Sequence, residues 1–218
     1  MKLKEVVCKG SFDLAETTRV VYSVSLTAEP ARLAKIVAGY EWALSQFPDV
    51  ALYVGDGPLL ETTLRLSDNC GEPPERARAI AGKTLQALND VGRPAEIFAA
   101  SALPSNPTFV DALQRINAQI SLAPMLRASV ESDAEDYVNR VERRNELVVD
   151  KAHATELAKQ YIAFEIAGYL TLARAGYLVD VYATGSSELP TLARFIHGEL
   201  TGFPELAERK CLILGRKK

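Results

Sequence analysis

A tyrosine and a glutamate stand four residues apart in a strongly apolar stretch of the chain. Tyr161 and Glu165 lie within the segment YIAFEIAGYL, and this spacing places both side chains on one face of a helix. A carboxylate on an apolar face is costly to bury unless it meets a hydrogen-bond donor or a cation. A buried glutamate here would hold an ammonium group or move a proton near neutral pH. The alternative is a glutamate that faces solvent beside a tyrosine of the core.

Three further polar residues fall at the carboxyl ends of segments that are typical of strands. These are Ser25, Asp56 and Tyr182. Ligands of α/β proteins bind outside the carboxyl ends of the parallel strands, so these three positions are candidates for a site. A serine in such a place can serve as a nucleophile if a base is at hand. The alternative for Ser25 is a serine that only ends a strand.

Several common catalytic signatures are missing from the sequence. There is no GxGxxG after the first strand, no GxxxxGK[ST] and no GxSxG, which argues against nucleotide phosphate loops and against an α/β-hydrolase. His153 and His197 have no acidic or cysteine partner at ligand spacing, so we expect them to be surface or packing residues. Cys8, Cys70 and Cys211 lie far apart, which argues against a zinc site or a disulfide framework. We expect neither a metal nor a cofactor.

An alternation of strands and helices would have to position these residues. Apolar runs predict strands over 20–26, 50–54, 97–100, 178–182 and 211–214, and periodic segments predict helices over 33–47, 75–91, 107–120, 134–148, 154–175 and 190–200. Gly176 is expected to end the longest helix in the left-handed conformation. The alternation predicts an α/β fold: a single three-layer Rossmann-like domain over residues 1–218, with a mostly parallel five-stranded sheet.

The composition is that of an ordinary globular chain. The 218 residues are 48% hydrophobic and 24% charged, and they carry 25 Lys and Arg against 28 Asp and Glu, a formal net charge of −3. This balance excludes a protein that binds polyanions through bulk charge, but not one with a local basic patch. We find no apolar run long enough to cross a membrane and no signal-peptide core. The expectation is a cytoplasmic monomer without membrane contact.

Read together, three stretches resemble the tRNA-dependent cyclodipeptide synthases. Residues 20–47, VVYSVSLTAEPARLAKIVAGYEWALSQF, are similar to the nucleophile strand of that family and the helix that follows it. Tyr161 and Glu165 match the Y-x-x-x-E pair of the family's catalytic helix. Residues 182–203, which close with ELTGF and precede CLILG, are similar to the region around a late tyrosine. The order and spacing of these stretches match along nearly the whole chain.

The resemblance implies an aminoacyltransferase of secondary metabolism that joins two aminoacyl-tRNAs into a 2,5-diketopiperazine. It also implies a Rossmann-like domain related to the catalytic domains of tyrosyl- and tryptophanyl-tRNA synthetases. Ser25 would attack the aminoacyl ester and hold the first amino acid covalently. Tyr161 and Glu165 would hold its α-ammonium, Glu165 would accept a proton from the second amine, and Tyr182 would assist ring closure. An aminoacyl ester is already activated, so the resemblance implies no ATP, metal or cofactor.

The chain departs from the family's pattern at several positions. Ala28 stands where Asn is common, Ala183 follows the late tyrosine in place of Gln or Pro, and Phe109 replaces a tyrosine of the substrate site. These departures favour a second interpretation, an aminoacyl-tRNA-dependent transferase that uses another amine as acceptor. A third interpretation is a non-catalytic α/β binding protein, in which Ser25 and Glu165 do not share a pocket.

The expected tRNA contacts are weak or differently placed. The helix that is strongly basic in the family corresponds to residues 75–93, where Arg76, Arg78 and Lys83 are the candidates for phosphate contacts. The positive excess of this helix is small. Other candidates are the basic tail over 208–218 and a cluster on the charged helix predicted over 134–148, made up of Arg140, Arg143 and Arg144. The alternative for that cluster is a solvated helix face.

Three residues are candidates for the walls of a substrate pocket: Leu52, Phe109 and Asp180. Asp180 lies two residues before Tyr182, so both side chains should point to the same face of the sheet. An unpaired carboxylate beside the pocket would favour a cationic side chain such as arginine or lysine. The alternative is an aspartate that meets solvent or a local arginine.

Overall fold

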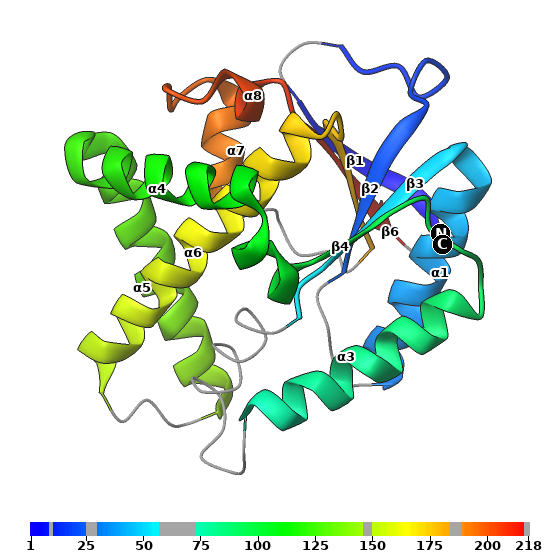
Figure 1. Cartoon of the computed structure of the whole chain (residues 1–218), viewed down its shortest axis with the longest axis horizontal. Helices are drawn as coiled ribbons and strands as arrows, with labels where there is room; N and C mark the ends of the chain where they lie inside the picture. Colours follow the sequence, from blue (N-terminus) through cyan, green and yellow to red (C-terminus); the bar gives the residue numbers. More distant parts are fainter. Residues whose placement is uncertain (9–10, 25–29, 57–72, 146–149, 184–188, 216–218) are drawn as a thin grey trace.

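The computed structural model describes residues 1–8, 11–24, 30–56, 73–145, 150–183 and 189–215. A six-stranded sheet in the order β1-β6-β5-β2-β3-β4 forms its centre (Figure 1). The strands are β1 (Lys2–Val7), β2 (Arg19–Val24), β3 (Asp49–Val54), β4 (Ile97–Ala99), β5 (Val179–Tyr182) and β6 (Lys210–Gly215). Neighbouring strands run parallel, except that β1 is antiparallel to β6. The mostly parallel α/β sheet expected from the sequence is therefore present.

The sheet has six strands in place of the predicted five, because β1 was not expected. β1 has the sequence KLKEVV, and its side chains are exposed or only half-buried. Its charges hide any alternation of apolar and polar residues, and its pairing with β6 shifts register between Leu3 and Glu5. An antiparallel edge strand on a parallel sheet is common in doubly wound folds. β1 is a strand because β6 offers it a hydrogen-bonding edge, and local sequence does not report that.

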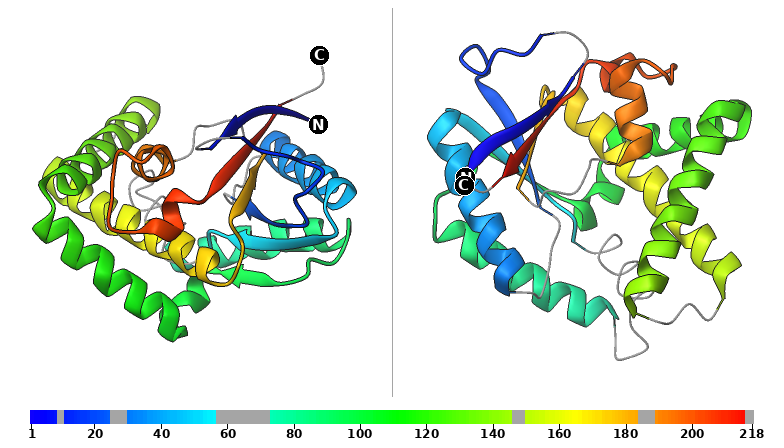
Figure 2. Two further views of the ribbon diagram at one scale, coloured as in Figure 1. Left: turned by 90° about the horizontal axis from the view of Figure 1, so that it is seen from above. Right: turned by 180° about the vertical axis from the view of Figure 1, so that it is seen from behind.

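Helices cover both faces of the sheet (Figure 2). One face carries α1 (Pro30–Gln46) and α3 (Pro73–Asn89), which pack against Val20, Tyr22 and Leu52 in one apolar core. A second core on the other face contains Val21, Ala51 and Tyr53. It is covered by the 3₁₀-helix η1 (Ala100–Ser105) and by α4 (Pro107–Leu122), α5 (Pro124–Asn145), α6 (Lys151–Arg174), α7 (Pro190–His197) and α8 (Pro204–Ala207). This arrangement is a Rossmann-like α/β fold.

Three helical elements among the described residues differ from the prediction. α5 begins at Pro124, ten residues before the predicted start at 134, and the short helices η1 and α8 were not expected. The many charges of α5 concealed a narrow apolar stripe that is buried against α4 and α6. Its members are Leu126, Val130, Ala134, Val138 and Val141. Because this stripe has only one residue per turn, it gives a weak periodic signal.

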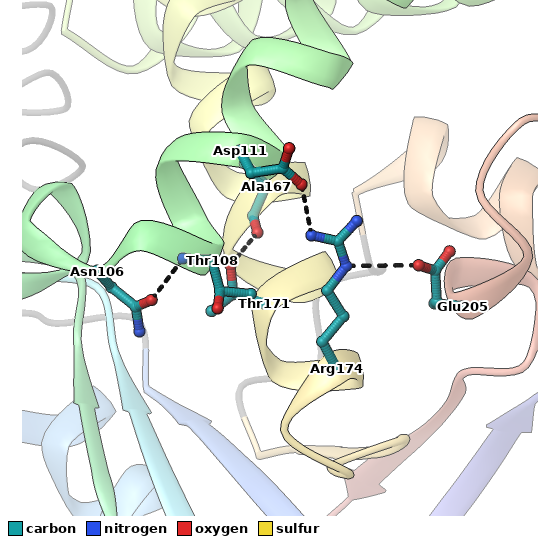
Figure 3. Close-up of polar contacts among 7 residues, drawn as sticks. All are labelled: Asn106, Thr108, Asp111, Ala167, Thr171, Arg174 and Glu205. Carbon is teal, nitrogen blue, oxygen red and sulfur yellow. Dashed lines mark hydrogen bonds and ion pairs between the residues drawn. The ribbon is translucent and has the colours of Figure 1, made fainter.

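α6 is the element that carries the candidate pair, and both of its ends are fixed. The side chain of Asp150 accepts a hydrogen bond from the backbone N–H of His153 at the N-terminus. At the other end Gly176 has φ +89°, which confirms the predicted left-handed residue. Arg174 in the last turn bonds Asp111 of α4 at 2.8 Å and Glu205 of α8 at 3.4 Å (Figure 3). The helix is therefore held in a defined position against the sheet.

Candidate active site

The carboxyl ends of three adjacent parallel strands define the edge at which the candidate residues gather. β2 ends at Val24, which pairs with Val54 of β3, and β5 ends at Tyr182. Ser25 directly follows Val24 in sequence, but it lies outside the described residues, as does Ala28. The separation of Ser25 and Glu165, on which the catalytic and the non-catalytic interpretations differ, therefore also lies outside the described residues.

Tyr161 and Glu165 lie together on the face of α6 that turns toward this edge. The Tyr161 hydroxyl lies near the Glu165 carboxylate and acts on its pKa. The ring of Tyr161 stacks on that of Tyr137 from α5, with centroids 5.5 Å apart and planes at 19°. Glu165 lies deep in the molecule yet keeps part of its surface accessible. The sequence prediction that the two side chains share one helix face is confirmed.

The environment of Glu165 shifts its ionisation to the neutral range. Burial raises the pKa of Glu165 to about 7, the nearby Tyr161 hydroxyl opposes this rise, and the negative charges of Asp180 and Asp133 add to it. A carboxyl group with this pKa exchanges protons readily at physiological pH. An ammonium group placed against it would supply the missing positive charge and favour the carboxylate.

Tyr182 is part of a group of three phenols that sequence reasoning had only partly identified. Its hydroxyl is hydrogen-bonded to the hydroxyl of Tyr169, which lies one helical turn beyond Glu165 on α6. The ring of Tyr53, from β3, packs edge-on against Tyr169 with centroids 5.5 Å apart. The spacing of Tyr161, Glu165 and Tyr169 at i, i+4 and i+8 was the signal that could have pointed to Tyr169.

Asp180 faces the same side of the sheet as Tyr182, and its charge is already matched. Arg209, which the sequence analysis placed in the basic tail over 208–218, is buried and not available to tRNA: it lies 3.4 Å from Asp180 Oδ2, and the two side chains are 1% and 2% exposed. Burial raises the pKa of Asp180 to about 6, against the opposing effect of the Arg209 charge. The expectation of a cationic substrate assumed an unpaired carboxylate, and that assumption does not hold.

A cleft of about 270 Å³ opens beside Tyr161, between α5, α6 and the start of α7. Its walls include the stacked rings of Tyr161 and Tyr137, the acid Asp133 and the bases Arg140 and Arg143. Arg140 and Arg143 therefore border the candidate site. Arg144 is outside the side chains that the structure describes.

Asp133 joins the cleft to the start of α7. Asp133 Oδ2 accepts hydrogen bonds from the backbone N–H of Thr191 at 2.8 Å and from its hydroxyl at 2.7 Å. The Thr191 hydroxyl also lies 2.8 Å from that of Ser129. The N-terminus of α7 is thus held by a carboxylate from α5, a favourable place for a negative charge.

Two predicted pocket residues are buried in the cores, Leu52 on the opposite face of the sheet from this group and Phe109 on the same face. Leu52 is fully buried in the core under α1 and α3, on the face of the sheet away from α6. The prediction for Leu52 is therefore wrong: alternation along β3 brings the next residue, Tyr53, to the α6 side. Phe109 is also buried, in the core on the α6 side, where its ring lies 4.7 Å from that of Phe164.

The remaining candidates have surface or structural positions. Asp56 accepts hydrogen bonds from the backbone N–H and the hydroxyl of Ser101, at 2.9 and 2.7 Å. Both of its carboxylate oxygens are therefore bonded to a residue of η1. The basic residues Arg76, Arg78 and Lys83 lie exposed on α3, on the other face of the sheet. His153 and His197 are exposed, as predicted.

Two kinds of feature are missing from the residues that the structure describes. In these parts of the chain, no group of three or more His, Cys, Asp or Glu side chains is placed to hold a metal ion. Across the same residues, none of the helices is long and apolar enough to cross a membrane.

We expect Gly168→Ala to destabilise the fold, because Gly168 lets α6 approach the phenol of Tyr53. An added Cβ would lie 2.4 Å from Tyr53 Oη and 3.1 Å from Cζ, so the ring or the helix must shift. Overpacking of this kind costs about 1–3 kcal/mol, which denaturant unfolding measures. Gly82→Ala is the matched control, since a Cβ there meets nothing within 4 Å and alanine is the better helix former. Equal stabilisation by both substitutions would contradict this account.

The fold matches solved structures of cyclodipeptide synthases. One from Staphylococcus haemolyticus superposes with a TM-score of 0.73 at 14% identity over 94% of each chain. One from Bacillus thermoamylovorans gives a TM-score of 0.73 at 14% identity, over 92% of this chain and 90% of the other. A Mycobacterium tuberculosis protein, whose structure relates cyclodipeptide synthetases to type I tRNA synthetases, gives 0.67 at 16% identity over 91% and 85%.

At the level of sequence the comparisons give no match. No family model matches the chain, and a search of curated proteins finds no significant match. Identities of 13–16% to the solved structures establish the fold alone. Over more than nine tenths of its length, this chain has the fold of the cyclodipeptide synthases.

Proposed function

We propose that this chain is an aminoacyltransferase that uses two aminoacyl-tRNAs to form a cyclodipeptide. The observation that carries the proposal is the neighbouring pair of Tyr161 and Glu165, which lies deep in the molecule yet keeps part of its surface accessible, and whose carboxylate acts on Tyr182. A carboxylate and a phenol in this arrangement suit the α-ammonium of an amino acid. The shared fold with cyclodipeptide synthases supports the same reaction class.

The proposed reaction has three steps. The hydroxyl of Ser25 attacks the ester carbonyl of an aminoacyl-tRNA, the bond to the ribose oxygen breaks, and the serine proton goes to that oxygen. The amine of a second aminoacyl-tRNA then attacks the ester on Ser25, forms an amide, and returns a proton to the serine oxygen. The free amine of the dipeptidyl-tRNA finally attacks its own ester, which closes the ring and releases the second tRNA.

Side chains of α6 and β5 would carry out the proton transfers of these steps. Glu165, with a pKa of about 7, holds the first ammonium as a carboxylate and accepts a proton when the second amine attacks. Tyr182 donates to the ribose oxygen that leaves in the closing step. Because each ester is already activated, no step requires ATP or a metal.

The tRNA would meet two groups of bases. The first group lies exposed along α3 and consists of Arg76, Arg78 and Lys83. Contacts of these side chains with phosphates would require little desolvation of the protein. Arg140 and Arg143 border the cleft beside Tyr161, close to where the aminoacyl end would lie. Each phosphate contact adds affinity that falls with salt, so a small set predicts weak binding with a shallow salt dependence.

Product analysis tests the proposal. Cells that express the chain are expected to release diketopiperazines detectable by mass spectrometry, and Ser25→Ala is expected to abolish them while the protein stays folded. Labelled aminoacyl-tRNA should leave label on the wild-type chain and none on Ser25→Ala. Labelled protein with a linear or conjugated product would favour transfer to another amine. Absence of label from both proteins would reject both transferase interpretations.

A further inference from the structure

Tyr169 is a buried phenol that the proposed reaction does not use directly. It lies four residues beyond Glu165 on α6, is about 1% exposed, and its hydroxyl is hydrogen-bonded to that of Tyr182. A phenol has one proton to donate, so only one of the two can donate in this contact. Which one donates decides where the remaining proton points.

The surroundings favour Tyr169 as the donor. Tyr169 is enclosed, whereas Tyr182 keeps part of its surface accessible. If Tyr169 donates to Tyr182 Oη, the proton of Tyr182 remains available to a group in the accessible space. Burial raises the pKa of Tyr182 well above its ordinary value, and the hydrogen bond from Tyr169 lowers it, which is the effect of a donor on a phenolate.

Three contacts keep the ring of Tyr169 in place. The guanidinium of Arg209 lies 4.8 Å from the centroid of the ring, and Arg209 Nη1 donates to the Tyr169 carbonyl at 3.3 Å. Tyr53 packs edge-on from β3. Arg209 is itself held by the Tyr177 carbonyl at 2.8 Å and by Asp180 at 3.4 Å. Asp180 lies two residues before Tyr182 on β5. Arg209 therefore links the helix that carries Tyr169 to the strand that carries Tyr182.

We propose that Tyr169 is a positioning residue for Tyr182. It donates its phenol proton to Tyr182 Oη and so directs the proton of Tyr182 toward the substrate, while the buried pair of Arg209 and Asp180 keeps Tyr169 in register. The inference rests on the proposed function, in which Tyr182 assists ring closure. It adds Tyr169 and Arg209 to the predicted site, and it gives Asp180 a structural role in place of a contact with substrate.

Tyr169→Phe tests the inference, because it removes one oxygen and keeps the ring. In a chain labelled at the tyrosine Cζ carbons, the NMR resonance of Tyr182, assigned by its loss in Tyr182→Phe, is expected to move when Tyr169 loses its hydroxyl. The kcat for cyclic product is expected to fall about tenfold with KM unchanged, the effect of one hydrogen bond on the reacting group. Tyr40→Phe is the matched control, a buried tyrosine on the other face of the sheet that donates to the Gly92 carbonyl at 3.3 Å.

The outcomes separate this inference from the proposed function. An active wild type together with a Tyr169→Phe variant of equal kcat overturns the inference and leaves the function standing. An unmoved Tyr182 resonance overturns it as well, whatever the activity. A wild type without diketopiperazine overturns the function and the catalytic part of the inference together. Arg209→Lys keeps the charge but loses the planar guanidinium with its several N–H donors. If Tyr169 acts through its position, this variant should also have a lower kcat than the wild type.

Discussion

Glu165→Gln should make the protein inactive and, above neutral pH, more stable. The substitution keeps the volume and one oxygen near Tyr161, but removes the charge that the proposed reaction needs. Loss of a group that both binds the ammonium and accepts a proton is expected to lower product formation at least about 100-fold. Diketopiperazine yield by mass spectrometry measures this effect.

The gain in stability follows from the pKa of Glu165. Its pKa in the folded protein is about 7, above the ordinary value of 4.5, because burial disfavours the charged form. The folded state therefore binds the proton more tightly, and wild-type stability falls as pH rises through this window. Glutamine does not ionise, so the advantage of the variant should grow by about 2 kcal/mol between pH 5 and pH 8.

Denaturant unfolding at the two pH values measures that difference. Glu156→Gln makes the same substitution at an exposed position of α6, where the carboxylate only meets Lys159 at 3.8 Å. This control is expected to keep the wild-type yield and pH dependence. If the variant at Glu165 behaved like the control, the carboxyl group would be an ordinary surface group and the proposed role would fail.

Arg209→Met should be the most destabilising of the substitutions considered. It leaves the Asp180 carboxylate buried without its cation, and it takes one donor away from each of the carbonyls of Tyr169 and Tyr177. Removing one partner of a buried pair costs about 3–5 kcal/mol. The loss should be smaller at pH 5 than at pH 8, because the pKa of Asp180, which burial raises to about 6, lets the acid take up a proton.

A double-mutant cycle isolates the charge from the packing. In the Asp180→Asn background Arg209→Met leaves no carboxylate without its cation at this position, so it should cost clearly less than in the wild type at pH 8. Arg194→Met is the surface control, since Arg194 and Glu199 are 4.0 Å apart and both are largely exposed. That change is expected to stay within about 1 kcal/mol. Equal costs of Arg209→Met in the two backgrounds would show that the ion pair contributes nothing to stability.

Much of the candidate site could be predicted because it depends on local periodicity. Tyr161 and Glu165 are on one face of α6 because four residues make about one helical turn, and the apolar run around them requires burial. β2 and β3 were predicted from short β-branched runs, and their parallel pairing followed from the helix between them. Gly176 was identified as the helix end because glycine adopts positive φ at little cost.

Other features lay beyond local reasoning because they depend on contacts between distant segments. An apolar strand buried on both faces does not reveal which of its residues face which helix layer, so Leu52 was chosen where Tyr53 faces α6. The apolar stripe of α5 became visible only against its neighbours, and β1 needed the edge of β6.

By itself the sequence determined the α/β alternation, the helix that carries Tyr161 and Glu165, and the strand ends that point to one edge. Tertiary structure alone decided what surrounds them. Arg209 reaches Asp180 across 29 residues of sequence, and Tyr169 meets Tyr182 across the junction of α6 and β5. Periodicity fixes the face of an element on which a side chain lies, whereas its partner depends on how whole elements pack. Hence the charge of Asp180 suggested a substrate cation in the sequence and proved to be matched by a protein cation in the fold.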